Sequence, residues 1–340
     1  MQEPWLILGQ TLHPYGLIIA IAAAALLLWM GIAGYKRRLP IGTVRIFGIL
    51  AIVFGIFFSR LFFCLFNLSL FTETYENPWL MLCFWDGGLS MCGLLTGLVV
   101  AAWLAAKLMN IRLGTLLDTL TPPLGLFLAA CRAAEYFTDL GVGKVVEEGI
   151  GTQLFPWLFL QEAAGIATEY RLAVFAYEAA AGVLIALWML LFTRSIRKSR
   201  TTRPGDLSLL FFSLYGTVQM LLESMRDDGH MLITFLRVSQ VFAALLPLTA
   251  AAIWSRRYIR VRQQGDKRII ISWLLLLGCV ALGILLEFSL DGRLTIGTPS
   301  MLRDYGIMLV LCAMLFAIPY SLFSALRKKG GRSGSIRVRI

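Results

Sequence analysis

Charged side chains occur inside strongly apolar segments of this chain, where an ion is costly to bury. Arg132 and Glu135 are three residues apart, so they share one face of a predicted helix. An ionisable residue in a membrane span costs roughly 2.5–3.5 kcal/mol on insertion scales and is therefore a functional candidate by default. A guanidinium binds phosphate bidentately and stays charged, so an arginine at this depth favours an anionic head group as ligand.

A second polar stripe follows a later apolar segment. Its members are spaced so that they form one continuous face of a helix; they are Tyr215, Gln219, Glu223 and Arg226. Further candidates stand near the ends of other apolar segments; they are Tyr15, Arg60, Asp86 and Glu178. Together these residues predict a shared polar cavity. The alternative is structural: the opposite charges would pair only to hold helices together.

The segment 85–97 places an acid, glycines and a thiol at the start of an apolar helix. Its polar members are Asp86, Gly87, Gly88, Ser90 and Cys92. A membrane span does not need a flexible, polar entrance. Non-helical backbone at membrane depth persists only where protein or a water-filled cavity satisfies its amides. The segment therefore predicts that the site lies inside the membrane.

The composition is that of a membrane protein. Of the 340 residues 58% are hydrophobic and 15% are charged, and the mean hydropathy is +0.76. A soluble domain carries about 25% charged residues. Nine apolar segments approach the roughly 20 residues that a helix needs to cross a bilayer, at about 15–35, 46–66, 88–107, 114–136, 172–193, 207–225, 235–255, 269–288 and 305–326. Because helices and closed barrels are the only spanning structures, these segments predict an all-α polytopic membrane protein.

The net charge of +11 is unevenly distributed. Clusters of Lys and Arg follow the first, third, fifth and seventh predicted spans and also end the chain. The positive-inside rule then predicts that the N-terminus lies outside and the C-terminus in the cytoplasm. The polar candidates would lie in the outer half of the membrane. The basic excess is an orientation signal, so we predict no nucleic-acid partner.

Metal and disulfide chemistry find no support in the sequence. The chain has two histidines, and its six cysteines lack the C-x-x-C spacing of zinc sites. We predict no metal site and no cofactor. The chain organisation predicts a seven-helix membrane domain at 1–256, a basic cytoplasmic linker at 257–268, and a two-helix membrane appendage with a basic tail at 269–340.

Several of these motifs resemble those of the prolipoprotein diacylglyceryl transferase family. Residues 85–94 resemble its Trp-(Glu/Asp)-Gly-Gly-Met-Ser-Phe-His-Gly-Gly motif. Shorter similar motifs are His-Pro-Tyr-Gly at 13–16, Ser-Arg-Leu at 59–61, Asp-Thr-Leu-Thr-Pro at 118–122, Tyr-Glu at 177–178 and the polar stripe at 215–226. The resemblance covers about residues 10–256, in the order of the seven predicted helices, and leaves out the last two spans.

The resemblance implies an enzyme of the bacterial plasma membrane that moves a diacylglyceryl group from phosphatidylglycerol to the lipobox cysteine of a prolipoprotein. Arg132, Tyr15 and Tyr215 would be catalytic, with Arg132 on the phosphate. The remaining candidates would bind substrate; they are Arg60, Asp86, Gly87, Gly88, Ser90, Cys92, Glu135, Gly143, Glu178, Gln219, Glu223 and Arg226.

The chain departs from the family pattern at positions that carry charge. Residues 131–135 resemble the signature Gly-Arg-x-Gly-Asn, but its asparagine is replaced by Glu135. The family's histidine is replaced by Cys92, and its arginine in the sixth span by Gln219. Loss of one donor to a developing oxyanion costs on the order of a hundredfold in rate.

Three hypotheses follow from these residues. The first is an active diacylglyceryl transferase, or a close variant with a different head-group preference. The second is a catalytically inactive paralogue that binds lipid or lipoprotein as an adaptor or regulator. The third is a small-molecule transporter, although the chain lacks the paired discontinuous helices in matching halves that are typical of transporters.

Overall fold

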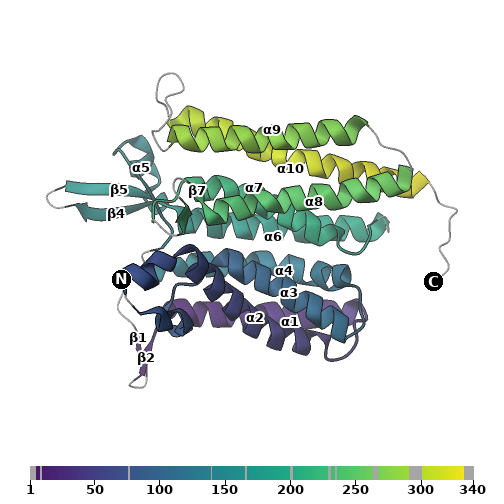
Figure 1. The fold of residues 1–340 in the computed structure, drawn as a ribbon, viewed down its shortest axis with the longest axis horizontal. Helices are drawn as coiled ribbons and strands as arrows, with labels where there is room; N and C mark the ends of the chain where they lie inside the picture. The colour runs from purple at the N-terminus through teal and green to yellow at the C-terminus, as the bar shows by residue number, and fades with distance from the viewer. Residues whose placement is uncertain are drawn as a thin grey trace. The chain divides into compact units, whose positions relative to one another are not determined.

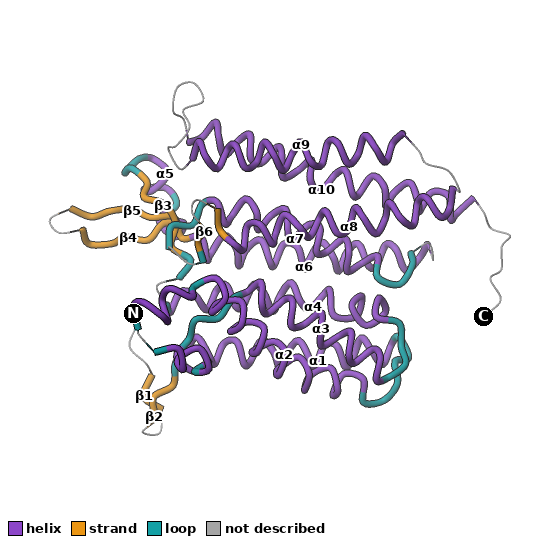
Figure 2. The backbone as a smooth tube through the Cα atoms, viewed as in Figure 1, coloured by secondary structure: helices purple, strands orange, loops and turns teal. Residues whose placement is uncertain are grey.

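Helices make up most of the described chain (Figure 2). The computed structural model describes residues 5–7, 10–75, 77–138, 140–164, 167–199, 202–228, 231–233, 236–262, 267–290 and 301–332. Within these residues nine helices are long and apolar enough to cross a membrane. They are α1 (Pro14–Lys36), α2 (Thr43–Phe66), α3 (Met91–Leu108), α4 (Leu113–Ala134), α6 (Val174–Ser199), α7 (Asp206–Ser224), α8 (Val238–Arg262), α9 (Lys267–Leu290) and α10 (Met301–Arg332). The prediction of an all-α polytopic membrane protein is confirmed.

Short elements fill the connections between the long helices. The helical ones are η1 (Leu70–Thr74), η2 (Pro78–Leu82), η3 (Phe84–Asp86), η4 (Glu135–Phe137), α5 (Ile150–Leu154) and η5 (Pro156–Leu158). The strands are β1 (Trp5–Ile7), β2 (Gln10–Leu12), β3 (Val142–Val146), β4 (Phe159–Ala164), β5 (Ala167–Ala173), β6 (Leu232–Ile233) and β7 (Leu236–Arg237). Strands β3, β5 and β4 form one antiparallel sheet in that order, and all three belong to the chain segment that connects α4 to α6. The sequence analysis did not predict this sheet.

The chain divides into two compact units. Unit 1 comprises residues 1–187, 225–233 and 237–239, and unit 2 comprises 188–224, 234–236 and 240–340. Helix α8 continues through residues 257–262, which the sequence analysis had assigned to a linker. Helices α7 and α8 therefore belong to the same unit as α9 and α10.

Unit 1 is a helical bundle in which α2 packs closely on α3 (Figure 1). Two glycines, Gly93 and Gly97, make this approach possible. A Cβ atom on Gly93 would lie 2.2 Å from the carbonyl oxygen of Phe58, and one on Gly97 would lie 2.3 Å from that of Phe54. Small residues at this spacing allow helix backbones to approach each other in membranes.

The polar candidates that belong to unit 1 gather at one of its ends because its neighbouring helices are antiparallel. The hydroxyl of Ser59, near the end of α2, donates to the carbonyl oxygen of Ser90, just before α3. Arg132, at the end of α4, contacts Glu178, near the start of α6. The opposite end carries basic residues, namely Lys36, Arg38, Arg45, Lys107 and Arg112. Which end faces the cytoplasm remains a prediction of the positive-inside rule.

A hydrophobic core in the described part of unit 2 receives residues from α7, α8, α9 and α10. Met220 of α7, Ala251 of α8, Leu276 of α9 and Leu315 of α10 are buried in it. Near the start of α7, the Asp206 carboxylate accepts hydrogen bonds from Trp254 and Arg257 of α8. Apolar packing along the helices and buried polar contacts near the start of α7 therefore hold the helices of this unit together.

Gly97→Ala tests the close packing of α2 on α3. The added methyl would collide with backbone, so we expect a loss of about 1–3 kcal/mol of stability and a lower melting temperature in detergent. Gly31→Ala is the matched control, because nothing lies within 4 Å of a Cβ at Gly31. That variant should melt at the wild-type temperature or slightly above it. Equal melting temperatures for both variants would contradict the packing described.

Candidate functional site

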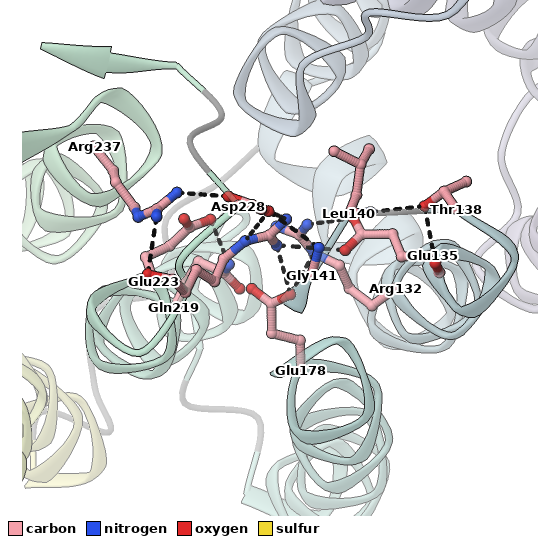
Figure 3. Close-up of polar contacts among 11 residues, drawn as sticks. Arg132, Glu135, Thr138, Leu140, Gly141, Glu178, Gln219, Glu223, Asp228 and Arg237 are labelled. Atoms are coloured by element: carbon pink, nitrogen blue, oxygen red, sulfur yellow. Dashed lines mark hydrogen bonds and ion pairs between the residues drawn. The ribbon is translucent and has the colours of Figure 1, made fainter. Parts of the chain in front are cut away.

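A buried network of opposite charges lies at one end of unit 1 (Figure 3). Arg132 Nη1 donates to Glu135 Oε1 at 2.6 Å, and Arg132 Nε lies 3.3 Å from Glu178 Oε2. Arg226 Nη1 lies 2.9 Å from the same Glu178 oxygen and 3.4 Å from Glu135 Oε2. All four side chains are at most 7% exposed. Each arginine therefore shares both carboxylates with the other.

Asp228 and Arg237 extend this network. The Asp228 carboxylate accepts hydrogen bonds from Arg226 Nη2 at 2.5 Å, from Arg237 Nη1 at 2.7 Å and from the backbone N–H of Gly141 at 3.0 Å. Burial alone would raise the pKa of Asp228, but the two guanidinium groups and these hydrogen bonds hold it well below its usual range. Three arginines thus face three carboxylates, and we call these six residues the charge network; they are Arg132, Glu135, Glu178, Arg226, Asp228 and Arg237.

The turn after α4 fixes the position of Glu135. The hydroxyl of Thr138 donates to the Glu135 carbonyl oxygen at 2.8 Å and accepts from the N–H of Leu140 at 3.2 Å. Gly141 follows with a φ of +77°. A Cβ at Gly141 would lie 2.7 Å from Glu135 Oε2 and 2.7 Å from Phe175 Cβ. Only glycine fits this position, for its conformation and for its space.

Arg226 lies beyond the helix on which the sequence analysis placed it. Helix α7 ends at Ser224, and Arg226 instead pairs with Gly143 of β3 in an isolated β-bridge. The N–H of Lys144 donates to the carbonyl oxygen of Met225. A Cβ at Gly143 would lie 2.6 Å from Val174 Cγ2, so Gly143 serves close packing. The predicted continuous stripe therefore stops at Glu223.

Arg60 organises the glycine-rich segment before α3. Its Nη1 donates to the Gly87 carbonyl oxygen at 2.6 Å, its Nη2 to that of Leu80 at 2.5 Å, and its Nε to that of Met81 at 3.0 Å. Gly88 has a φ of +60°, and a Cβ there would lie 2.7 Å from Arg60 Nη1. The guanidinium thus supplies hydrogen-bond donors to backbone carbonyls that have no partner within a helix. A cavity of about 320 Å³ borders the Arg60 side chain.

Ser90 and Cys92 begin helix α3. Ser90 is the N-cap, and its hydroxyl accepts from the N–H of Gly93 at 3.4 Å. Cys92 is buried in the first turn. Gly87 has a φ of +84°. Asp86 ends η3, but its side chain lies outside the described residues. These positions shape the segment that Arg60 holds.

Tyr15 stands near the charge network. It is the second residue of α1, and it lies within electrostatic reach of Glu135 and Arg132. The structure therefore brings together Tyr15, Arg132, Glu135, Glu178 and Arg226 within unit 1.

The other polar candidates lie in unit 2, on α7. Tyr215, Gln219 and Glu223 are buried, with 7%, 6% and 3% of their surface exposed. Gln219 Nε2 donates to Glu223 Oε1 at 3.0 Å. The Tyr215 ring stacks on Phe211, with ring centroids 5.9 Å apart. In α7 the predicted helical spacing is confirmed.

Sequence analysis missed Asp228 and Arg237 as site residues. Asp228 lies outside the predicted spans, and Arg237 is the third residue of the span predicted at about 235–255. The sequence Arg226-Asp227-Asp228 directly after a span was the available signal. Asp228 also lines a cavity of about 340 Å³ with Tyr136 and Phe175. In the part of the chain that the structure describes, no cluster of three or more His, Cys, Asp or Glu could hold a metal ion.

The network can position a polar ligand, but its charges are already balanced. Arginine is suited to phosphate because its planar donors match two oxygens at once. Here Arg132 and Arg226 already contact carboxylates, so an anionic ligand must compete with Glu135 and Glu178 for them. Removing one partner of such a buried ion pair lowers the free energy of unfolding by about 3–5 kcal/mol.

Comparison with known proteins identifies relatives over most of the chain. The sequence model of the prolipoprotein diacylglyceryl transferase family matches residues 5–256. A phosphatidylglycerol–prolipoprotein diacylglyceryl transferase from Bacillus licheniformis is 28% identical over 255 residues, which cover 74% of this chain and 90% of the relative. Proteins of the same name from Bacillus velezensis and Lactococcus lactis subsp. cremoris are 29% and 25% identical, covering 76% and 73% of this chain and 92% and 91% of the relatives.

Asp228→Asn tests the role of this carboxylate in the charge network. Because its pKa is lowered in the folded protein, its stabilisation is present above the ordinary aspartate pKa of about 3.9 and is lost as pH falls towards the folded value. The melting temperatures of wild type and variant should therefore differ at neutral pH and converge below about pH 4. Asp227→Asn is the control, since Asp227 is 54% exposed and its ion pair with Arg171 is a surface pair. A difference that grows as pH falls would contradict this assignment.

Proposed function

The chain belongs to the prolipoprotein diacylglyceryl transferase family, and from this premise we propose that it transfers a diacylglyceryl group from phosphatidylglycerol to the lipobox cysteine of a prolipoprotein. The curated relatives carry that activity in their names. The products would be a thioether-linked lipoprotein precursor and glycerol phosphate. The reaction takes place in the bacterial plasma membrane, where the protein is multi-pass.

The buried charge network carries this proposal. Arg132 keeps the arginine of the family signature, and it lies at the end of unit 1 where Tyr15 also begins α1. A buried guanidinium is the group that recognises the phosphodiester of the donor lipid and stabilises charge as the phosphate leaves. In this scheme Arg132 binds the phosphate, and Tyr15 and Tyr215 are proposed hydrogen-bond donors to the substrates.

The chemistry is a displacement at an sp³ carbon. The lipobox thiol loses its proton, its sulfur bonds to the terminal glycerol carbon of the diacylglyceryl group, and the bond from that carbon to the phosphate oxygen breaks. We assign Glu135 as the base that accepts the thiol proton. Its Oε2 receives no hydrogen bond from a described side chain or backbone group.

Arg132→Ala tests the phosphate role. We expect transfer of labelled diacylglyceryl from phosphatidylglycerol nanodiscs to a lipobox peptide to fall by about a hundredfold or more, because one donor to the leaving oxyanion is lost. Arg45→Ala is the matched control, since Arg45 is exposed and lies at the opposite end of unit 1. Wild-type rates in the Arg132 variant would remove this residue from the reaction.

An inactive paralogue that binds lipid or lipoprotein is the second candidate function. The observation that favours it is the ion pair of Arg132 with Glu135, whose atoms Nη1 and Oε1 lie 2.6 Å apart. At the position of Glu135 the family pattern has an uncharged asparagine. In addition, Gln219 stands where that pattern has an arginine, and its amide is bonded to Glu223.

Restoring the family residues separates the two candidates. The triple variant Cys92→His, Glu135→Asn and Gln219→Arg should not exceed the wild-type transfer rate if the wild type is an enzyme that uses Glu135. A silent wild type with an active triple variant would instead identify an inactive paralogue on a competent scaffold. The same peptide assay measures both proteins, and their melting temperatures check that both are folded.

A further inference from the structure

We infer that helices α9 and α10, which lie beyond the segment matched by the family, brace the end of α7 and so position the residues that α7 and the following segment contribute to the reaction. The catalytic part of this inference rests on the proposed function. The structural part stands on contacts within unit 2.

Helices α7, α8, α9 and α10 share a core around Met220 of α7. Met220 is 4% exposed and packs in the cluster that includes Leu276 and Leu286 of α9 and Met308 of α10. Gly283 of α9 leaves space for it, since a Cβ there would lie 2.8 Å from Met220 Cε. The added helices therefore cover a face of α7 that would otherwise be apolar and open.

Tyr305 of α10 holds the last residue of α7. Its hydroxyl donates to the carbonyl oxygen of Ser224 at 3.1 Å. The last four carbonyl groups of a helix have no partner within the helix, and an unpaired one inside a membrane is strongly unfavourable. Tyr305 therefore stabilises the point at which α7 ends.

Glu287 of α9 supplies a second polar contact to the same region. Its Oε1 accepts from Gln240 Nε2 of α8 at 2.6 Å, and the same Gln240 nitrogen lies 3.5 Å from the carbonyl oxygen of Met220. Glu287 and Gln240 are 7% and 4% exposed. A buried acid in a membrane helix is costly, and its hydrogen bond joins α9 to α8 at the level of Met220.

Helical geometry links these contacts to the functional stripe. Met220 and Ser224 are one turn apart, and each directly follows a member of the stripe, Gln219 and Glu223. Successive residues of an α-helix are about 100° apart around its axis. Fixing the rotation of α7 through Met220 and Ser224 therefore fixes the direction in which Gln219 and Glu223 point.

Chain connectivity carries the constraint to the charge network. Met225 follows Ser224 directly, and its carbonyl oxygen accepts from Lys144. Arg226 and Asp228 come next and belong to the network. Within unit 2, Tyr305 thus holds Ser224, and within unit 1 Lys144 and the charge network hold Met225 and Arg226. Tyr305 and Glu287 are positioning residues in this account.

Tyr305→Phe in the full-length protein, in phosphatidylglycerol nanodiscs, tests the brace by hydrogen exchange. We expect amides at the end of α7 and in 225–228 to exchange about fivefold faster, as loss of one hydrogen bond of about 1 kcal/mol implies. Tyr320→Phe is the matched control on the same helix, since the described contacts of Tyr320 are ring contacts with Phe316 and Phe323.

Glu287→Leu, which removes the acceptor of the Gln240 amide, provides an independent variant with the same expectation. Exchange at control rates in both Tyr305→Phe and Glu287→Leu would overturn the brace. Faster exchange along all of α6 and α7 alike would also overturn it, because that pattern reports general destabilisation.

Transfer kinetics then connect the brace to catalysis. In Tyr305→Phe we expect kcat to fall about fivefold with KM unchanged, because orientation of reacting groups acts on the chemical step. Since hydrogen exchange does not require transferase activity, the brace remains testable if the proposed function fails. Faster exchange with an unchanged kcat would overturn the catalytic part and keep the structural part.

Discussion

The buried charge network is the constraint on which the site depends. Arg132 comes from the end of α4, Glu178 from the start of α6, and Arg226 from the segment after α7. None of these groups could be buried alone, because the desolvation of an unpaired ion in a low-dielectric interior costs several kcal/mol. Their mutual contacts therefore fix three chain segments together and place Tyr15 and Glu135 beside them.

The same network explains how this chain differs from the family pattern. An asparagine next to the signature arginine would leave it a net positive charge, whereas Glu135 neutralises Arg132 at 2.6 Å. Under the proposed function, lipid phosphate must then compete with the Glu135 carboxylate for Arg132, and the same carboxylate is the proposed base for the thiol. A fold does not guarantee its usual chemistry, so this charge balance is the feature that a test of activity must address.

Hydropathy and charge spacing were sufficient to predict the nine spans and the shared helical face of Arg132 and Glu135, because helical periodicity and the cost of buried charge act locally. They did not predict the sheet at β3–β5, the end of α7 at Ser224, or the roles of Asp228 and Arg237. Those features depend on pairing between distant segments, which periodicity does not record. Arg60 shows the same limit, since its backbone partners at Leu80 and Gly87 come from a non-helical segment.

The central claim is that this network performs diacylglyceryl transfer. The most direct measurement is mass spectrometry of a synthetic lipobox peptide after incubation with the purified wild-type protein and phosphatidylglycerol of defined acyl composition. The account predicts a peptide that has gained one diacylglyceryl group on its cysteine, with glycerol phosphate released in equal amount. An unmodified peptide, with folded protein that still binds the lipid, would contradict it.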